Sequence, residues 1–234
     1  VDMTDHQAIE QALRPNTKML FAETPINPNL VVLDLAFIGA FCRKHQLISI
    51  IDNTFLTPLL QRPADFGIDI VIHSATKYLN GHGDVVAGII VSDAERITTI
   101  KLTTLKDMGA TISPHDAWLI IRGLKTLSVR MERHCANAQK VAEYLATHAA
   151  VAKVYYPGLP DHPGYKFIGS QMKAAGGVLA FELNGSLDDG RFFINQCQLL
   201  SLAVSLGDAE SVIQHPASMT HSPYSAEERR AAGI

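Results

Sequence analysis

The sequence has few cysteines, no excess of either charge and no long apolar run. Its three cysteines, Cys42, Cys135 and Cys197, lie far apart. This odd, scattered set excludes a disulfide framework and a Cys-x-x-Cys zinc site, and it favours a reducing cytoplasmic compartment. No apolar run approaches the roughly 18 residues that a membrane-spanning helix needs. We therefore expect a cytoplasmic protein with no membrane partner.

Charge and metal-ligand spacing exclude two further classes. Twenty Lys and Arg residues against 23 Asp and Glu give a net charge of −3 over 234 residues, which argues against a nucleic-acid partner. The ten histidines include no His-x-x-x-His pair, so we expect no metal site. Hydrophobic residues make up 47% of the chain, as in globular proteins rather than disordered or coiled-coil chains.

The first half of the chain alternates between helix and strand patterns. Thr4 and Gln7 have the spacing of a capping box and predict a helix that continues to about Leu13. Apolar runs predict buried strands. The pattern predicts strands at 18–22, 47–51, 69–73 and 85–91, with a helix at 34–45. This alternation predicts an α/β fold with a mainly parallel sheet sandwiched by helices.

The second half predicts a smaller α/β domain. Residues 113–148 form a long helical stretch, followed by a strand at 178–183, a helix at 191–199 and a strand at 202–206. We therefore expect a large domain at 1–127 and a smaller one at 128–234. The first residue is Val1, not Met, and we expect the chain to be a piece of a longer protein.

Asp52 directly follows a predicted strand. Parallel sheets bind ligands beyond the carboxyl ends of their strands, and an unpaired buried carboxylate costs several kcal/mol. Asp52 therefore needs a cation or several hydrogen-bond donors. It is compatible with a helix N-cap or a turn, or with a cationic group of a ligand.

Lys77 follows the next predicted strand, which ends at His73. Two hydroxyl residues, Ser74 and Thr76, precede it, and glycines that permit close approach of a ligand follow it at 81 and 83. Lys77 is either an ordinary surface lysine or a desolvated nucleophile. A lysine that forms a Schiff base and a carboxylate that keeps a pyridinium nitrogen protonated are what pyridoxal 5'-phosphate (PLP) chemistry requires. The two hydroxyls suit a phosphate, or local turn hydrogen bonds.

Five motifs resemble one enzyme family along the whole chain. They are ETPINP (23–28), IDNT (51–54), HSATKYLNGHGD (73–84), SLGDAES (205–211) and HPASMTH (215–221). In this order they resemble the Cys/Met-metabolism PLP enzymes, which adopt the fold-type I PLP-dependent transferase fold. By this resemblance, the segment 1–127 is the later part of the PLP-binding domain.

The resemblance implies a role for each matching residue. Lys77 resembles the Schiff-base lysine and Asp52 the pyridinium partner, while Ser74 and Thr76 resemble the phosphate-binding hydroxyls. Asn27 resembles an amide near the cofactor's phenolic oxygen and the substrate carboxylate, and Ser205 a contact of that carboxylate. Within the family, the segment LKDM (105–108) is similar to the substrate entrance of the methionine γ-lyase group. Lys106 and Asp107 are thus candidate substrate contacts, or a solvated charge pair.

The resemblance also implies a reaction and an assembly. The expected reaction is the α,γ-elimination of L-methionine to methanethiol, 2-oxobutanoate and ammonia. Cystathionine cleavage and γ-replacement, as in cystathionine γ-synthase or a homoserine-ester sulfhydrylase, use the same cofactor residues and stay open, as does an inactive structural fragment. The family forms homotetramers, dimers of dimers with shared active sites. Its early phosphate loop, its stacked tyrosine and its late substrate-binding arginine have no counterpart among these residues.

Overall fold

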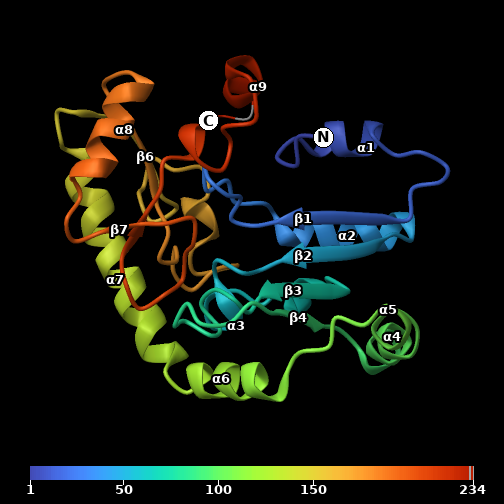
Figure 1. The fold of residues 1–234 in the computed structure, drawn as a ribbon. Coiled ribbons are helices and arrows are strands. Elements are labelled where there is room, and N and C mark those ends of the chain that lie inside the picture. The colour runs from blue at the N-terminus through green and yellow to red at the C-terminus, as the bar shows by residue number, and fades with distance from the viewer. Residues whose placement is uncertain (232, 234) are drawn as a thin grey trace.

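The computed structural model describes residues 1–231 and 233, which form a mixed α/β structure (Figure 1). The first half contains α1 (His6–Gln11), β1 (Met19–Glu23), α2 (Leu35–His45), β2 (Ile48–Asp52), α3 (Thr57–Leu60), β3 (Ile70–Ser74), β4 (Gly88–Val91), α4 (Ala94–Ile100), a π-helix (Lys101–Leu105) and α5 (Lys106–Met108). The second half contains α6 (Pro114–Leu124), α7 (Leu127–Ala146), β5 (Val151–Tyr155), β6 (Ala180–Leu183), α8 (Leu187–Gln196), β7 (Ser201–Leu202), β8 (Val212–Ile213) and α9 (Ala226–Ala231). Short 3-10 helices span Pro63–Phe66, Tyr165–Phe167 and Pro216–Ser218.

The main sheet has the order β1-β2-β3-β4. β1 pairs with β2 and β2 with β3 in parallel, whereas β4 runs antiparallel to β3. Glu23 is the register partner of Asp52, and Asp52 that of Ile72. The mainly parallel sheet is therefore confirmed, and its first three strands end at one common edge.

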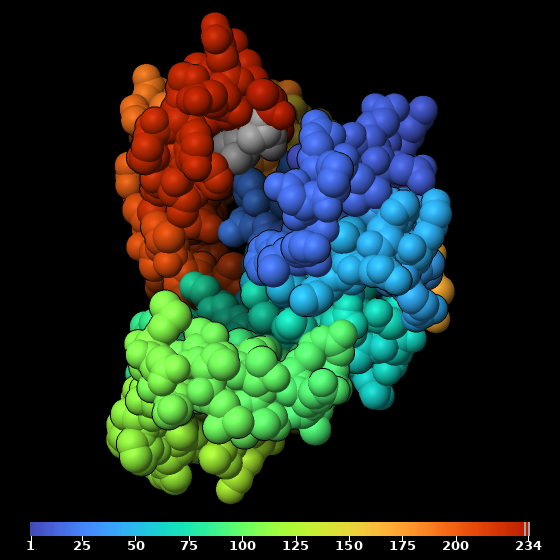
Figure 2. All heavy atoms as spheres, turned by 90° about the vertical axis from the view of Figure 1, so that its right-hand side faces the viewer, coloured from blue at the N-terminus to red at the C-terminus, as the bar shows by residue number. Residues whose placement is uncertain are grey.

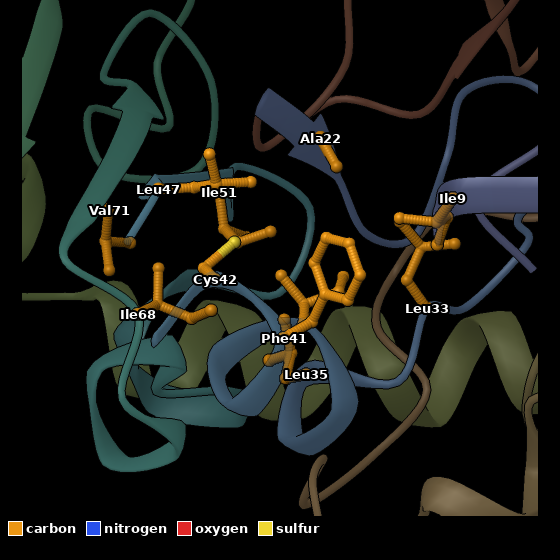
Figure 3. Packing of buried hydrophobic residues seen from close by; sticks show 11 residues of the cluster. Ile9, Ala22, Leu33, Leu35, Phe41, Cys42, Leu47, Ile51, Ile68 and Val71 are labelled. Atoms are coloured by element: carbon orange, nitrogen blue, oxygen red, sulfur yellow. The ribbon is translucent and has the colours of Figure 1, made fainter. Parts of the chain in front are cut away.

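The core between this sheet and α2 fixes the position of that edge. Ile51 of β2 and Cys42 of α2 lie at its centre, with exposed fractions of 0% and 1% (Figure 3). Each fully buried aliphatic side chain contributes about 1.5–3 kcal/mol to folding. Burial raises the pKa of the Cys42 thiol to about 11, so this cysteine is an inert part of the core at neutral pH.

The opposite face of the sheet is open among the described residues. Met19 and Phe21 of β1 are 53% and 60% exposed, and Ile48 and Ile90 are exposed on the neighbouring strands. α1 and α2 contribute to the core on the other face, where His6 of α1 stacks on a phenylalanine of α2. In Figure 1, α2 lies behind β1 and β2, while α7 runs down the left-hand side of the molecule.

Several predicted element ends are wrong. The N-cap of α1 is Asp5, not Thr4, because the Asp5 carboxylate accepts two backbone N–H groups of the first turn, whereas the Thr4 hydroxyl binds Asp2. α8 begins earlier than predicted, because Ser186 and Asp189 form a capping box. β4 begins at Gly88 rather than at residue 85, and β7 ends at Leu202 rather than 206. β5, β8 and the π-helix were not predicted.

The second half forms two small sheets, β5-β6 and β7-β8. The long helical prediction at 113–148 is confirmed as α6 and α7, with a break at Lys125 and Thr126. The division into domains at residue 127 stays a prediction. Among the described residues, no helix is both long and apolar enough to span a bilayer.

Candidate active site

A small cavity of about 140 Å³ opens where β1, β2 and β3 end. Four of the predicted site residues, Asn27, Asp52, Ser74 and Lys77, line it together. The rest of the lining is Glu23, Pro25, Thr54, Phe55 and Leu206. Figure 2 shows the surface hollowed between the blue N-terminal part of the chain and the orange and red C-terminal part, with teal residues below. The common edge of the strands thus gathers residues that are 183 positions apart at the extremes, from 23 to 206.

The Asp52 carboxylate is only partly hydrogen-bonded. Its Oδ1 accepts the backbone N–H of Thr54 at 2.8 Å. Within the described part of the chain, Oδ2 accepts no hydrogen bond and no cationic side chain forms an ion pair with Asp52. The carboxylate can therefore take a further donor from a ligand in the cavity.

His73 of β3 is near Asp52 but does not provide a positive charge for its carboxylate. It is buried, and burial lowers the pKa of the imidazole even though Asp52 opposes the shift. His73 is consequently neutral at pH 7. A cation that pairs with Asp52 must come from the cavity itself.

Lys77 lines the same cavity from a tight turn after β3. Its backbone N–H donates to the Ser74 carbonyl at 3.1 Å, and its carbonyl accepts the Gly81 N–H at 2.8 Å. The Nζ atom donates one long hydrogen bond, of 3.4 Å, to Ser205 Oγ. The amine is thus oriented by the fold, and within residues 1–231 and 233 it forms no ion pair with a carboxylate.

The segment that carries Ser205 packs directly on the backbone of the lysine turn. Gly207 has φ +84°, and a Cβ there would lie 2.6 Å from the Tyr78 nitrogen and 3.2 Å from the Lys77 Cα. Only glycine fits this close approach without displacement. Gly207 therefore lets Ser205 and Leu206 reach Lys77 from a part of the chain about 130 residues away.

The two predicted phosphate hydroxyls differ in their surroundings. Ser74 lines the cavity, and its backbone N–H donates to Thr54 Oγ1 at 2.8 Å. Thr76 is not among the lining residues, and its hydroxyl is hydrogen-bonded to the carbonyl and the N–H of Ala87. These bonds join residues that are 11 positions apart, across the connection between β3 and β4, so they are not the local turn hydrogen bonds expected as the alternative. The phosphate role of both residues stays a prediction.

Glu23 is a lining residue that was not predicted individually. Burial is the main reason why the pKa of its carboxyl is raised, and the nearby Asp52 charge adds to this shift. The backbone N–H of Asn27, which donates to Oε1 at 3.0 Å, opposes it. The position of Glu23 was available from the sequence, because Glu23 ends β1 as Asp52 ends β2. Two carboxyl groups on paired strand ends thus give the cavity a negative side.

Lys106 and Asp107 lie away from the cavity. They belong to α5. In Figure 1, α5 lies next to α4, at the right, while the strands that border the cavity end toward the left. Both side chains are about two-thirds exposed, and their charged atoms are 3.8 Å apart. The structure does not bring them to Lys77, and their role in substrate binding stays a prediction. No group of three His, Cys, Asp or Glu side chains in the described ranges is placed to hold a metal.

Comparisons with known proteins agree on one family. The family described as Cys/Met metabolism PLP-dependent enzyme matches residues 1–234. L-methionine gamma-lyase of Pseudomonas putida is 54% identical over all of this chain and 59% of its own length. Cystathionine beta-lyase of Coxiella burnetii is 45% identical over all of the chain and 61% of its own length. The chain therefore spans about three-fifths of the length of these curated relatives.

Solved structures give the same picture. The crystal structure of cystathionine gamma synthase from Xanthomonas oryzae pv. oryzae in complex with cystathionine superposes with a TM-score of 0.95 at 46% identity, covering 100% of this chain and 60% of that one. The cystathionine gamma-lyase of Lactobacillus plantarum, complexed with L-serine, has a TM-score of 0.94 at 42% identity and covers 100% and 61%.

Proposed function

The chain belongs to the Cys/Met metabolism PLP-dependent enzymes, and we propose that it provides much of the active site of a carbon–sulfur lyase that acts on L-methionine. The observation that carries this proposal is that the Lys77 amine and the Asp52 carboxylate line one cavity at neighbouring strand ends. Neither group has a charged partner among the described residues. PLP requires an amine that can bind its aldehyde and a carboxylate that can pair with its ring nitrogen, and Lys77 and Asp52 without charged partners meet these two requirements.

The other lining residues fit the cofactor in their chemistry. Ser74 offers a hydroxyl and a turn for the phosphate, and Asn27 offers an amide for a ring oxygen or a substrate carboxylate. The cavity is smaller than the roughly 300 Å³ typical of complete ligand pockets. We infer that residues outside this chain, including those of a neighbouring subunit in a homotetramer, complete the site.

The side chains then divide the chemistry between them. Bound PLP supplies an electron sink that acidifies the protons next to the substrate's amino group. Asp52, whose Oδ2 accepts no hydrogen bond among the described residues, would hold a proton at the ring nitrogen of the bound group. Lys77 would hold the cofactor and would be the base for the Cα proton. Positioned proton transfer of this kind contributes about 10²–10⁴-fold. The Ser205 hydroxyl, which accepts a hydrogen bond from Lys77 Nζ, would orient this amine.

Methionine is the proposed substrate because the relatives named for it have a higher sequence identity to the chain than those named for cystathionine. Six curated relatives named L-methionine gamma-lyase are 50–54% identical to the chain, whereas two named cystathionine beta-lyase are 45% identical. The products would be methanethiol, 2-oxobutanoate and ammonia. We place the reaction in the cytoplasm, in keeping with three free cysteines. Cystathionine is the alternative substrate, favoured by the names of the solved structures.

Product analysis tests this assignment. The natural full-length protein is supplied with PLP and incubated separately with L-methionine and L-cystathionine. The proposal predicts a yellow protein that releases methanethiol and 2-oxobutanoate from methionine faster than it cleaves cystathionine. A yellow protein that cleaves only cystathionine would overturn the substrate, and a protein that stays colourless with PLP would support an inactive structural module instead.

A further inference from the structure

A chain of buried amide side chains lies beneath the cavity. Asn53, Gln61 and Gln171 have exposed fractions of 0%, 1% and 7%. Gln61 Nε2 donates to Asn53 Oδ1 at 2.9 Å, and Gln171 Nε2 donates to Gln61 Oε1 at 3.0 Å. None of the three side chains lines the cavity or carries a formal charge. The three amides thus form one continuous set of hydrogen bonds among buried side chains.

Gln61 joins the ends of two strands. Its Nε2 also donates to the backbone carbonyl of Thr24 at 3.2 Å. Thr24 lies between Glu23 and Pro25, and both of these residues line the cavity. A single amide nitrogen therefore bridges the loop after β1 and the residue after β2.

Asn53 completes the bridge on the β2 side. It lies between Asp52 and Thr54, the carboxylate and the N–H that face the cavity. Its Nδ2 donates to the carbonyls of Gln61 and Thr57 at 2.9 and 3.2 Å, and its backbone N–H donates to the Ile72 carbonyl at 2.9 Å. Every donor of this side chain is used, so its orientation is determined by its neighbours.

Gln171 ties this bridge to a distant part of the chain. Its Nε2 also donates to the Leu33 carbonyl at 2.9 Å, and its Oε1 accepts the Leu35 N–H at 2.9 Å. It lies 110 positions after Gln61 and comes from the predicted smaller domain. Removing one amide leaves buried polar partners unsatisfied, which the surrounding backbone can relieve only by moving.

We propose that Gln61, supported by Gln171, is a positioning residue that sets where the Asp52 carboxylate and the loop after β1 stand relative to the Lys77 amine. The inference rests on the proposed function for its consequence, because the position matters through the bound cofactor. Its structural part, the holding of two strand ends by one amide, stands on the hydrogen bonds alone.

The variant Gln61→Met tests the proposal, because Met has nearly the same length but no donor or acceptor comparable with an amide. Ser49→Ala is the matched control. Ser49 is also 0% exposed and also lies in β2, and its hydroxyl donates to Asp69 Oδ2 at 2.8 Å, away from the cavity. Four quantities are measured in the natural full-length protein: the Kd for PLP, the pH midpoint of its visible absorbance, the melting temperature, and the hydrogen exchange of the cofactor-free protein.

We expect Gln61→Met to raise the Kd for PLP about tenfold, the size seen when outer partners of a bound group are removed, and to shift the pH midpoint. In the cofactor-free protein, amide exchange at 23–28 and 52–54 should increase more than elsewhere. Ser49→Ala should lower the melting temperature and leave the midpoint and these two segments unchanged. Gln171→Met should act in the same direction, and the double variant should be little worse than Gln61→Met, since both act through one bridge.

Two results would overturn the proposal. One is a Gln61→Met protein with normal exchange at both segments. The other is a pair of variants in which Gln61→Met and Ser49→Ala lower the melting temperature equally, with the PLP midpoint unchanged in both. A wild-type protein that never becomes yellow would instead refute the proposed function, and the exchange measurement would still decide the positioning role.

Discussion

Two aspartates at opposite ends of the main sheet differ in their hydrogen bonding: Asp69, which directly precedes β3, and Asp52, which ends β2. Asp69 Oδ2 accepts the backbone N–H and the hydroxyl of Ser49 at 2.9 and 2.8 Å, and Asp69 Oδ1 accepts Arg96 Nη2 at 2.9 Å. Asp52, at the opposite end of β2, accepts one backbone N–H. One carboxylate is saturated by its own protein and the other is not.

The difference separates a structural carboxylate from one that can bind. A saturated carboxylate stabilises the fold, because breaking it leaves buried donors unpaired. An unsaturated carboxylate across a cavity from an amine gives up some stability and retains capacity for a ligand. The sheet places the first kind where β2 begins and the second where it ends, as expected for a parallel sheet with its site at the carboxyl edge.

The largest expected effect is that of removing the amine. Lys77→Ala should abolish covalent PLP binding and reduce turnover by at least about 10⁴-fold, since it removes both the attachment and the base. Turnover in the natural full-length protein is the measurement, with Lys140→Ala as the control, because Lys140 is an exposed lysine of α7 that does not line the cavity. Equal losses in the two variants would contradict the role of Lys77.

The second effect compares the two aspartates directly. Asp52→Asn should reduce turnover by about 10²–10³-fold, the size seen when one preorganised electrostatic partner is removed, with a small change in melting temperature. Asp69→Asn should destabilise the protein by about 1–3 kcal/mol and leave turnover per folded molecule unchanged. Denaturant unfolding and steady-state kinetics on both variants check this, and the comparison fails if the two exchange their phenotypes.

The third effect tests the close approach of the 205–207 segment to the lysine turn. Gly207→Ala meets the Tyr78 backbone and has a φ of +84°, whereas Gly109→Ala has a φ of +86° but nothing within 4 Å. Both variants carry the strain of a positive φ, about 1–2 kcal/mol. Only Gly207→Ala should also weaken PLP binding, because it displaces Ser205 from Lys77. Equal PLP affinities for the two variants would show that this contact does not support the site.

The smallest effect concerns Glu23 and is visible through pH. Because burial raises the pKa of Glu23 in the folded protein, stability is full below its ordinary value of 4.5 and is lost as the pH rises through the folded value. Glu23→Gln keeps an acceptor for the Asn27 N–H and removes this loss. The cofactor-free variant should melt higher than wild type at pH 7 and equally at pH 4. A difference that is larger at pH 4 would have the wrong sign.

The sequence was most informative where one local signal determined the structure. The apolar runs at 47–51 and 69–73 lie within one residue of β2 and β3, because strands buried between neighbours need apolar residues throughout. The same rule directed attention to the residues after each predicted strand, and the four predicted site residues among them that line one cavity are Asn27, Asp52, Ser74 and Lys77.

Features that depend on distant contacts were not predictable from a single chain. Val85 has a strand-like pattern but packs in a cluster with Tyr78 and Leu79, so β4 starts later. The amide of Gln171 reaches Gln61, 110 positions away, and neither residue has a distinctive local pattern. Helix capping is an intermediate case. The spacing of Ser186 and Asp189 is that of a capping box and is visible in the sequence. The spacing of Thr4 and Gln7 also indicates a capping box, but the adjacent Asp5 is the N-cap.

The most direct test of the account is to locate the PLP adduct. The natural full-length protein is loaded with PLP, reduced with borohydride, digested and analysed by mass spectrometry, alongside Asp52→Asn and Asp69→Asn. The account predicts a pyridoxyl group on the peptide that contains Lys77, and a pH profile of the visible absorbance that is altered in Asp52→Asn only. An adduct on another lysine, or an absorbance profile that Asp52→Asn leaves as in wild type, would contradict it.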